Sequence, residues 1–262
     1  MFVQEKVRTS SAWLQRKGVP RAGTGLSLEA GMDGFTGELS GLRAVRAAAV
    51  PNFAKPRERA RRERILSGYL GDQAVLVHEG RGYLYEGYFH RELAFPIRLF
   101  AAMGVRRMLF AVGLVPLAPA GEDRRVVLVE DHLDLTAGSP LRGAVDAGER
   151  PEPDPSLNCS GGLREKAERL AGVHGLKHET GVLAMLPGPL DPTPAERRML
   201  TALGAGYYGF SPAAEIAVAR SLGLETAIVG LTGSRAGWGE GSRTLIRDLF
   251  AEAATPAAAE VR

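Results

Sequence analysis

The 262-residue sequence predicts an α/β fold, and two observations support this prediction. Short apolar runs rich in β-branched residues alternate with segments whose apolar residues recur at helical spacing. Alternation of this kind is typical of a sheet covered by helices, in which binding sites gather at the carboxyl ends of strands and at helix N-termini. Because α/β folds of this size often form one unit, we expect a single domain over residues 1–262.

The alternating segments can be located along the chain. Apolar runs indicate buried strands at residues 74–78, 108–115, 125–129, 182–186 and 226–231. Apolar residues repeat with a helical period in residues 163–171 and 246–253.

Two further helices are predicted from their start and stop signals. Thr193 and Glu196 form a capping box, with Pro194 at the first helical position and Gly204 as the stop. Ser211 precedes a proline and is expected to begin the next helix as its N-cap.

The composition is that of an ordinary globular protein. Hydrophobic residues make up 45% and charged residues 24%, which favours neither a disordered nor a membrane protein. A net charge of +3 and one short basic run at residues 57–64 argue against nucleic-acid binding. The single cysteine, Cys159, excludes an internal disulfide, and no apolar run near the N-terminus is long enough for a signal peptide or a membrane span. We therefore expect a cytoplasmic protein, and the five histidines show no metal-ligand spacing.

The most distinctive motif runs from Gly80 to Tyr88, directly after a predicted strand. It reads Gly-Arg-Gly-Tyr-Leu-Tyr-Glu-Gly-Tyr. An arginine among glycines at a strand end suits a bidentate contact to an oxyanion, because the planar guanidinium matches phosphate and glycines let a ligand approach the backbone. The alternative interpretation is a surface turn with aromatic packing.

This motif resembles the signature of the purine nucleoside phosphorylases, Gly-Arg-Phe-His-Met-Tyr-Glu-Gly-Tyr. The resemblance continues in order and spacing at residues 50–53, 95–98, 131–133, 140–143 and 215–220. It implies the nucleoside phosphorylase fold, with a central mixed sheet or distorted barrel flanked by helices, and a homotrimer. It also implies that phosphate attacks C1′ of a nucleoside and releases the purine base, with inorganic phosphate as co-substrate and no other cofactor.

Four residues correspond to phosphate-binding positions of that family. Arg81 matches its phosphate arginine, and Ser211 matches its phosphate serine at a helix N-terminus. Thr24 stands where the glycine-rich first loop of the family has a serine, and it keeps a hydroxyl group. Arg61 replaces a family histidine; it either contacts phosphate or belongs to a solvated charged face.

The residues expected at the ribose are aromatic. Tyr85 matches the family tyrosine that contacts the sugar, whereas Tyr83 replaces a histidine and Phe210 replaces a methionine. Aromatic rings still pack on a sugar face, but they equally well fill the space of a lost ligand.

The base site departs furthest from the family. Residues 112–116 replace its Asn-Ala-Ala-Gly-Gly loop, and Pro192 replaces the glutamate that grips the purine. Asp191 is either a substitute acid or a turn and capping residue, and the latter is favoured. Ser234 aligns with the family's base-binding asparagine.

These observations leave three hypotheses open. The first is an active phosphorylase with altered base selection, whose partners are a nucleoside and phosphate. The second is a catalytically impaired member that serves as a ligand-binding or assembly subunit. The third is a hydrolase in which water replaces phosphate, although the retained arginine and serine would then have little purpose.

Overall fold

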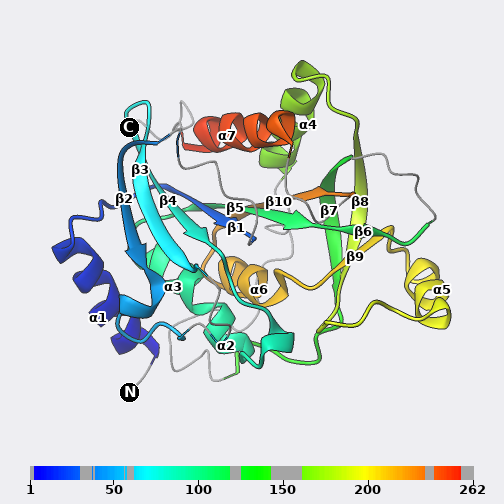
Figure 1. Cartoon of the computed structure of the whole chain (residues 1–262), viewed down its shortest axis with the longest axis horizontal. Coiled ribbons are helices and arrows are strands. Elements are labelled where there is room, and N and C mark those ends of the chain that lie inside the picture. The colour runs from blue at the N-terminus through cyan, green and yellow to red at the C-terminus, as the bar shows by residue number, and fades with distance from the viewer. Residues whose placement is uncertain are drawn as a thin grey trace.

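The computed structural model describes residues 3–29, 37, 39–55, 57, 62–118, 125–142, 161–233 and 239–254. Within these residues, ten strands form one mixed sheet in the order β2-β3-β4-β1-β5-β10-β7-β8-β9-β6 (Figure 1). The strands are β1 Thr24–Leu28, β2 Ser40–Arg46, β3 Arg64–Leu70, β4 Gln73–Glu79, β5 Arg107–Gly113, β6 Val115–Pro116, β7 Val126–Asp134, β8 His178–Met185, β9 Tyr207–Gly209 and β10 Glu225–Leu231.

The described helices cover both faces of this sheet. They are α1 Val3–Arg16, α2 His90–Leu93, α3 Phe95–Ala102, α4 Gly161–Val173, α5 Pro194–Ala202, α6 Ala213–Ser221 and α7 Glu240–Ala254. Helices α4 and α7 lie above the sheet in Figure 1, whereas α1, α3 and α6 lie below it. None of the helices in the described part of the chain is long and apolar enough to cross a membrane.

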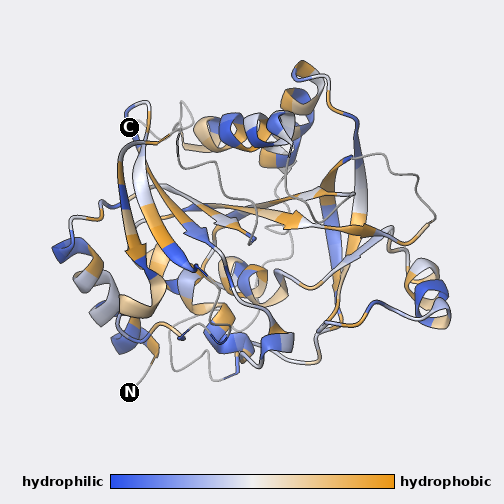
Figure 2. Cartoon of the chain, in the orientation of Figure 1, coloured by the Kyte–Doolittle hydropathy of each residue, from blue (hydrophilic) through white to orange (hydrophobic). Residues whose placement is uncertain are grey.

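The side chains of the central strand β5 pack on both faces of the sheet. On β5, Leu109 packs in the cluster that contains Leu249 of α7, whereas the next residue, Phe110, packs with Phe100 of α3 and Ile216 of α6. This alternation follows from the two-residue period of a strand, and burial on both faces explains why residues 108–112 are all apolar. The central strands are accordingly hydrophobic in Figure 2, and the outer faces of the helices carry the hydrophilic residues.

Four neighbouring strands run in the same direction and therefore end at the same edge. β1 pairs in parallel with β4 and β5, and β5 pairs in parallel with β10. The register places Leu28 beside Glu79 and Ala111, so β1 and β4 end at one level and β5 ends two residues further on, at Gly113. In sheets of this type, ligands bind beyond the carboxyl ends of the strands.

The predicted α/β class with a mixed sheet flanked by helices is confirmed. The five predicted strands and the predicted helices are present, with β7 and β8 longer than expected. The capping box at α5 is also confirmed, because the Thr193 side chain accepts from the Glu196 amide.

One strand was misinterpreted as a loop. The family resemblance places Thr24 in a glycine-rich loop, but Thr24–Leu28 form β1 at the centre of the sheet. The glycine there has a packing role, since a Cβ atom on Gly25 would lie 2.7 Å from the Met108 sulfur. The strand therefore needs a small residue at this position where neighbouring side chains crowd it.

Candidate active site

Two predicted phosphate residues meet beyond the carboxyl edge of the parallel strands. Arg81 follows β4 after Gly80, whose φ of 76° is favourable only for glycine. Ser211 follows β9 after Phe210, two residues before α6. The Arg81 Nη2 group donates to Ser211 Oγ at 2.6 Å, and only 1% of the Arg81 side chain is exposed.

A carboxylate that the sequence analysis did not consider completes this cluster. Glu29 directly follows β1, and its Oε1 atom accepts from Arg81 Nη2 at 2.8 Å and from Ser211 Oγ at 2.6 Å. Its Oε2 atom accepts from the backbone amide of Gly113, at the end of β5, at 2.8 Å. Glu29 therefore joins the ends of β1, β4 and β5 to the segment before α6.

A second carboxylate approaches the same arginine from α6. Arg81 Nη1 lies 3.4 Å from Glu215 Oε1, and both side chains are almost fully buried. Burial raises the pKa of Glu215, and the positive charge of Arg81 offsets this only in part. For Arg81, burial alone would lower the pKa, but Glu29 and Glu215 outweigh it and the pKa lies above its usual value. The guanidinium is thus a buried cation between two acidic groups.

Another buried polar pair lies beside Arg81. His78 Nε2 and Glu63 Oε1 are 2.8 Å apart, and both side chains are buried. These two residues line a small pocket together with Arg81, Gly82 and Tyr88. Buried polar side chains therefore surround Arg81 on the side of this pocket as well.

Two predictions at this site need correction. Thr24 is not near Arg81: it begins β1 at the opposite end of the parallel strands, and its hydroxyl donates to the Ala253 carbonyl at 3.0 Å. Ser211 does not cap α6 with its side chain, because the helix shows no side-chain cap and the hydroxyl donates to Glu29. The first error follows from the misassigned loop. The second arises because Ser211 Oγ accepts from the charged Arg81 Nη2 group rather than from a helix amide.

The predicted ribose residues form a row of aromatic rings. Tyr83 and Tyr85 are stacked with centroids 4.9 Å apart, and Phe210 meets Tyr85 edge-on at 5.9 Å. Gly188, with a φ of 70°, lies beneath these rings, because its Cβ would be 2.6 Å from Tyr85 and 2.9 Å from Phe210. Since Phe210 precedes Ser211, the row lies next to the Arg81 cluster.

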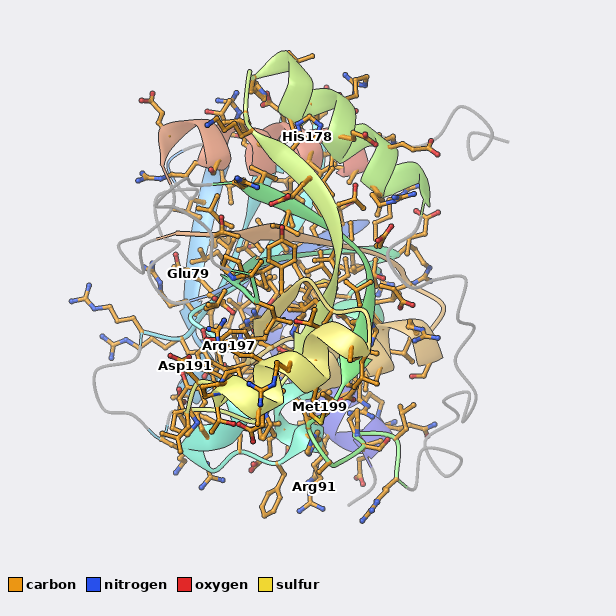
Figure 3. The ribbon with its side chains drawn as sticks, turned by 90° about the vertical axis from the view of Figure 1, so that its right-hand side faces the viewer. Glu79, Arg91, His178, Asp191, Arg197 and Met199 are labelled. Atoms are coloured by element: carbon orange, nitrogen blue, oxygen red, sulfur yellow. The ribbon has the colours of Figure 1, made fainter. Side chains whose placement is uncertain are left out.

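The predicted base-binding residue Asp191 forms a hydrogen bond with a tyrosine of β9. Asp191 is exposed, and its Oδ1 accepts from the Tyr208 hydroxyl at 2.9 Å, while the cap of α5 is Thr193. Arg197 of α5 lies over the same Tyr208 ring, and Figure 3 shows Asp191 and Arg197 on the same side of the molecule. The favoured capping interpretation of Asp191 is therefore wrong. Thr193 caps α5, and the Asp191 side chain instead accepts a hydrogen bond from Tyr208 on β9.

The altered loop after β5 continues as a short strand. Val115 and Pro116 pair antiparallel with Tyr208 and Tyr207, so this segment extends the sheet. Arg61 and Ser234 lie outside the described residues. Within the described residues, no group of three or more His, Cys, Asp or Glu side chains forms that could hold a metal ion.

Comparisons with known proteins decide the family. A model of the phosphorylase superfamily matches residues 30–262. Purine nucleoside phosphorylase from Mus musculus is 30% identical over 230 residues, which cover 85% of this chain and 79% of the mouse protein. The chain belongs to the purine nucleoside phosphorylase family.

Other relatives of this family agree. Purine nucleoside phosphorylase 1 from Geobacillus stearothermophilus is 29% identical over 221 residues, covering 84% of this chain and 80% of that protein. The solved structure of Schistosoma mansoni purine nucleoside phosphorylase complexed with a monocyclic inhibitor is 24% identical, with a TM-score of 0.84 over 98% of this chain and 99% of that one. The nucleoside phosphorylase fold implied by the sequence resemblance is thereby confirmed.

Proposed function

We propose that this chain cleaves the N-glycosidic bond of a nucleoside and transfers the pentose to inorganic phosphate. The observation that carries this proposal is the convergence of Arg81 Nη2 and Ser211 Oγ on one anionic acceptor, at 2.8 and 2.6 Å. A phosphate oxygen offers the same kind of acceptor as the Glu29 carboxylate. Relatives that carry the name purine nucleoside phosphorylase, at about 30% identity over most of the chain, support the same activity.

The chemistry follows from the positions of the groups. A phosphate oxygen held at Arg81 and Ser211 attacks C1′, the bond from C1′ to the base nitrogen breaks, and its electron pair leaves with the base, which then takes up a proton. Tyr85 and Phe210 provide the apolar wall on which the pentose packs next to the anion. Binding the two reactants side by side removes much of the entropic cost of bringing them together.

A second candidate function is ligand binding without turnover, as a catalytically impaired family member. It is favoured by the base half of the site, where Pro192 stands at the position of the family's base-gripping carboxylate and Asp191 is engaged by Tyr208. Proline offers no side-chain acceptor to a purine, so stabilisation of the departing base depends on other groups.

The two candidates are separated by measuring base release from inosine and guanosine with and without phosphate. Phosphorolysis predicts release that requires phosphate and yields pentose 1-phosphate. In Ser211→Ala we expect kcat/KM for phosphate to fall about 10- to 100-fold, the range for losing a hydrogen bond to a charged group. Ser221→Ala is the matched control, since the Ser221 hydroxyl donates only within α6, to the Val218 carbonyl. A folded protein that binds nucleoside but releases no base would favour the second candidate.

A further inference from the structure

The carboxylate of Glu29 uses the hydrogen-bond donors that an incoming anion needs. Three donors converge on it from separate parts of the fold: the guanidinium of Arg81, the hydroxyl of Ser211 and the amide of Gly113. Its side chain is 13% exposed and that of Arg81 is 1% exposed, so Glu29 is the more exposed member of this ion pair. A phosphate ion requires the same donors.

The charges around Arg81 add to this competition. The guanidinium is paired with Glu29 on one side and lies 3.4 Å from Glu215 on the other. A phosphate that joined this cluster with Glu29 in place would bring a further negative charge next to a carboxylate in a poorly solvated position. Like charges repel strongly under these conditions, because little water is present to screen them.

From this geometry we infer that Glu29 is a specificity-determining residue, which lowers the affinity of the anion site for phosphate by occupying it. Phosphate binds only when the Glu29 side chain leaves Arg81, Ser211 and the Gly113 amide. The consequence for activity rests on the function proposed above and is a high KM for phosphate. The consequence for binding does not depend on any turnover.

The test is calorimetric titration of inorganic phosphate into the full chain and into Glu29→Ala and Glu29→Gln. We expect the dissociation constant for phosphate to fall at least tenfold in Glu29→Ala, and by less in Glu29→Gln, because the amide keeps an acceptor for Arg81 but removes the charge. Glu225→Gln is the control. It makes the same charge change at the opposite end of the parallel strands, where Glu225 pairs with Arg107.

A thermal melt with and without phosphate accompanies each titration. If a Glu29 variant is less stable, phosphate should raise its melting temperature more than that of the unchanged protein, because a ligand stabilises the state that binds it. Equal phosphate affinity in all variants, or weaker affinity in Glu29→Ala, would overturn the inference. Base release that needs no phosphate and is lost in Glu29→Gln would also overturn it, since the carboxylate would then act on water.

The outcomes distinguish this inference from the proposed function. If the variants bind phosphate more tightly but no nucleoside is cleaved, the role of Glu29 stands and the proposed reaction fails. If nucleoside is cleaved with phosphate and the titrations show no difference, the reaction stands and the role of Glu29 fails.

Discussion

The site has an anion half, formed by Arg81, Glu29 and Ser211, and a base half, which contains Asp191. Different elements of the fold hold these two halves. Arg81, Glu29 and Ser211 lie at the ends of central elements, and their partners are 52 to 182 residues away in the chain. Asp191 is exposed and contacts Tyr208, 17 residues away, on a segment beside the outlying helix α5. Substitution of residues tied to the core disturbs the packing of the sheet, whereas residues on a connection are replaced at little cost. We therefore expect substitutions near Asp191 to be tolerated better than substitutions in the Arg81 cluster.

The largest expected effect comes from Arg81→Ala, which breaks the anion half. Glu29 and Glu215 would lose the cation between them, and removing one partner of a buried ion pair costs about 3–5 kcal/mol of unfolding free energy. Urea denaturation measures this loss, with Arg107→Ala as the control because Arg107 pairs with the half-exposed Glu225. A loss below about 1 kcal/mol would contradict the view that the buried core holds this half in place.

The same variant carries a prediction on pH. Burial already raises the pKa of Glu215, and loss of the Arg81 charge removes the main effect that opposes this rise. The folded variant then binds more protons than the unfolded chain, in which a glutamate has a pKa of about 4.3. Its stability deficit is therefore largest at neutral pH and shrinks as the pH falls toward that value.

A smaller effect is expected from Gly188→Ala, which changes the packing of the aromatic row next to the anion half. The positive φ of Gly188 disfavours alanine by about 1–2 kcal/mol, and the new Cβ displaces Tyr85 and Phe210. We expect the KM for nucleoside to rise about tenfold, or about 1.4 kcal/mol, while phosphate affinity changes little. Gly172→Ala is the control, since a Cβ there meets no atom within 4 Å. A loss of phosphate affinity equal to the loss for nucleoside would show that the halves are coupled.

The smallest effect is expected from Thr193→Ala, which tests the base half alone. Loss of the N-cap of α5 costs about 1 kcal/mol of unfolding free energy. Thr201→Ala is the control, because the Thr201 hydroxyl donates within the same helix to Arg197. Phosphate affinity should remain unchanged, and a weaker affinity would mean that α5 supports the anion half.

The sequence predicts those parts of this molecule whose signals are local. The capping box of Thr193 and Glu196 and the apolar runs of β4 and β10 depend on neighbouring residues, and these predictions were correct. The strand β1 was missed because Thr24 and Gly25 look like loop residues. The need for glycine becomes clear only from the packing of Met108, Phe100 and Val105 around it.

The site could be predicted only in part, for the same reason. Arg81 and Ser211 follow from a motif, but a carboxylate directly after a strand has no local pattern that marks it. Glu29 becomes recognisable when the parallel register of β1, β4 and β5 brings their ends together.

The hydrogen bond from the Gly113 amide to Glu29 makes the state of the anion site visible to spectroscopy. The amide proton of Gly113 points at the carboxylate, so its chemical shift and its rate of exchange with solvent depend on whether Glu29 is in place. In an isotope-labelled sample, this one resonance would follow the carboxylate as phosphate is added. The Gly113 amide therefore reports whether Glu29 occupies the anion site or has left it, and no dye or substituted side chain is required.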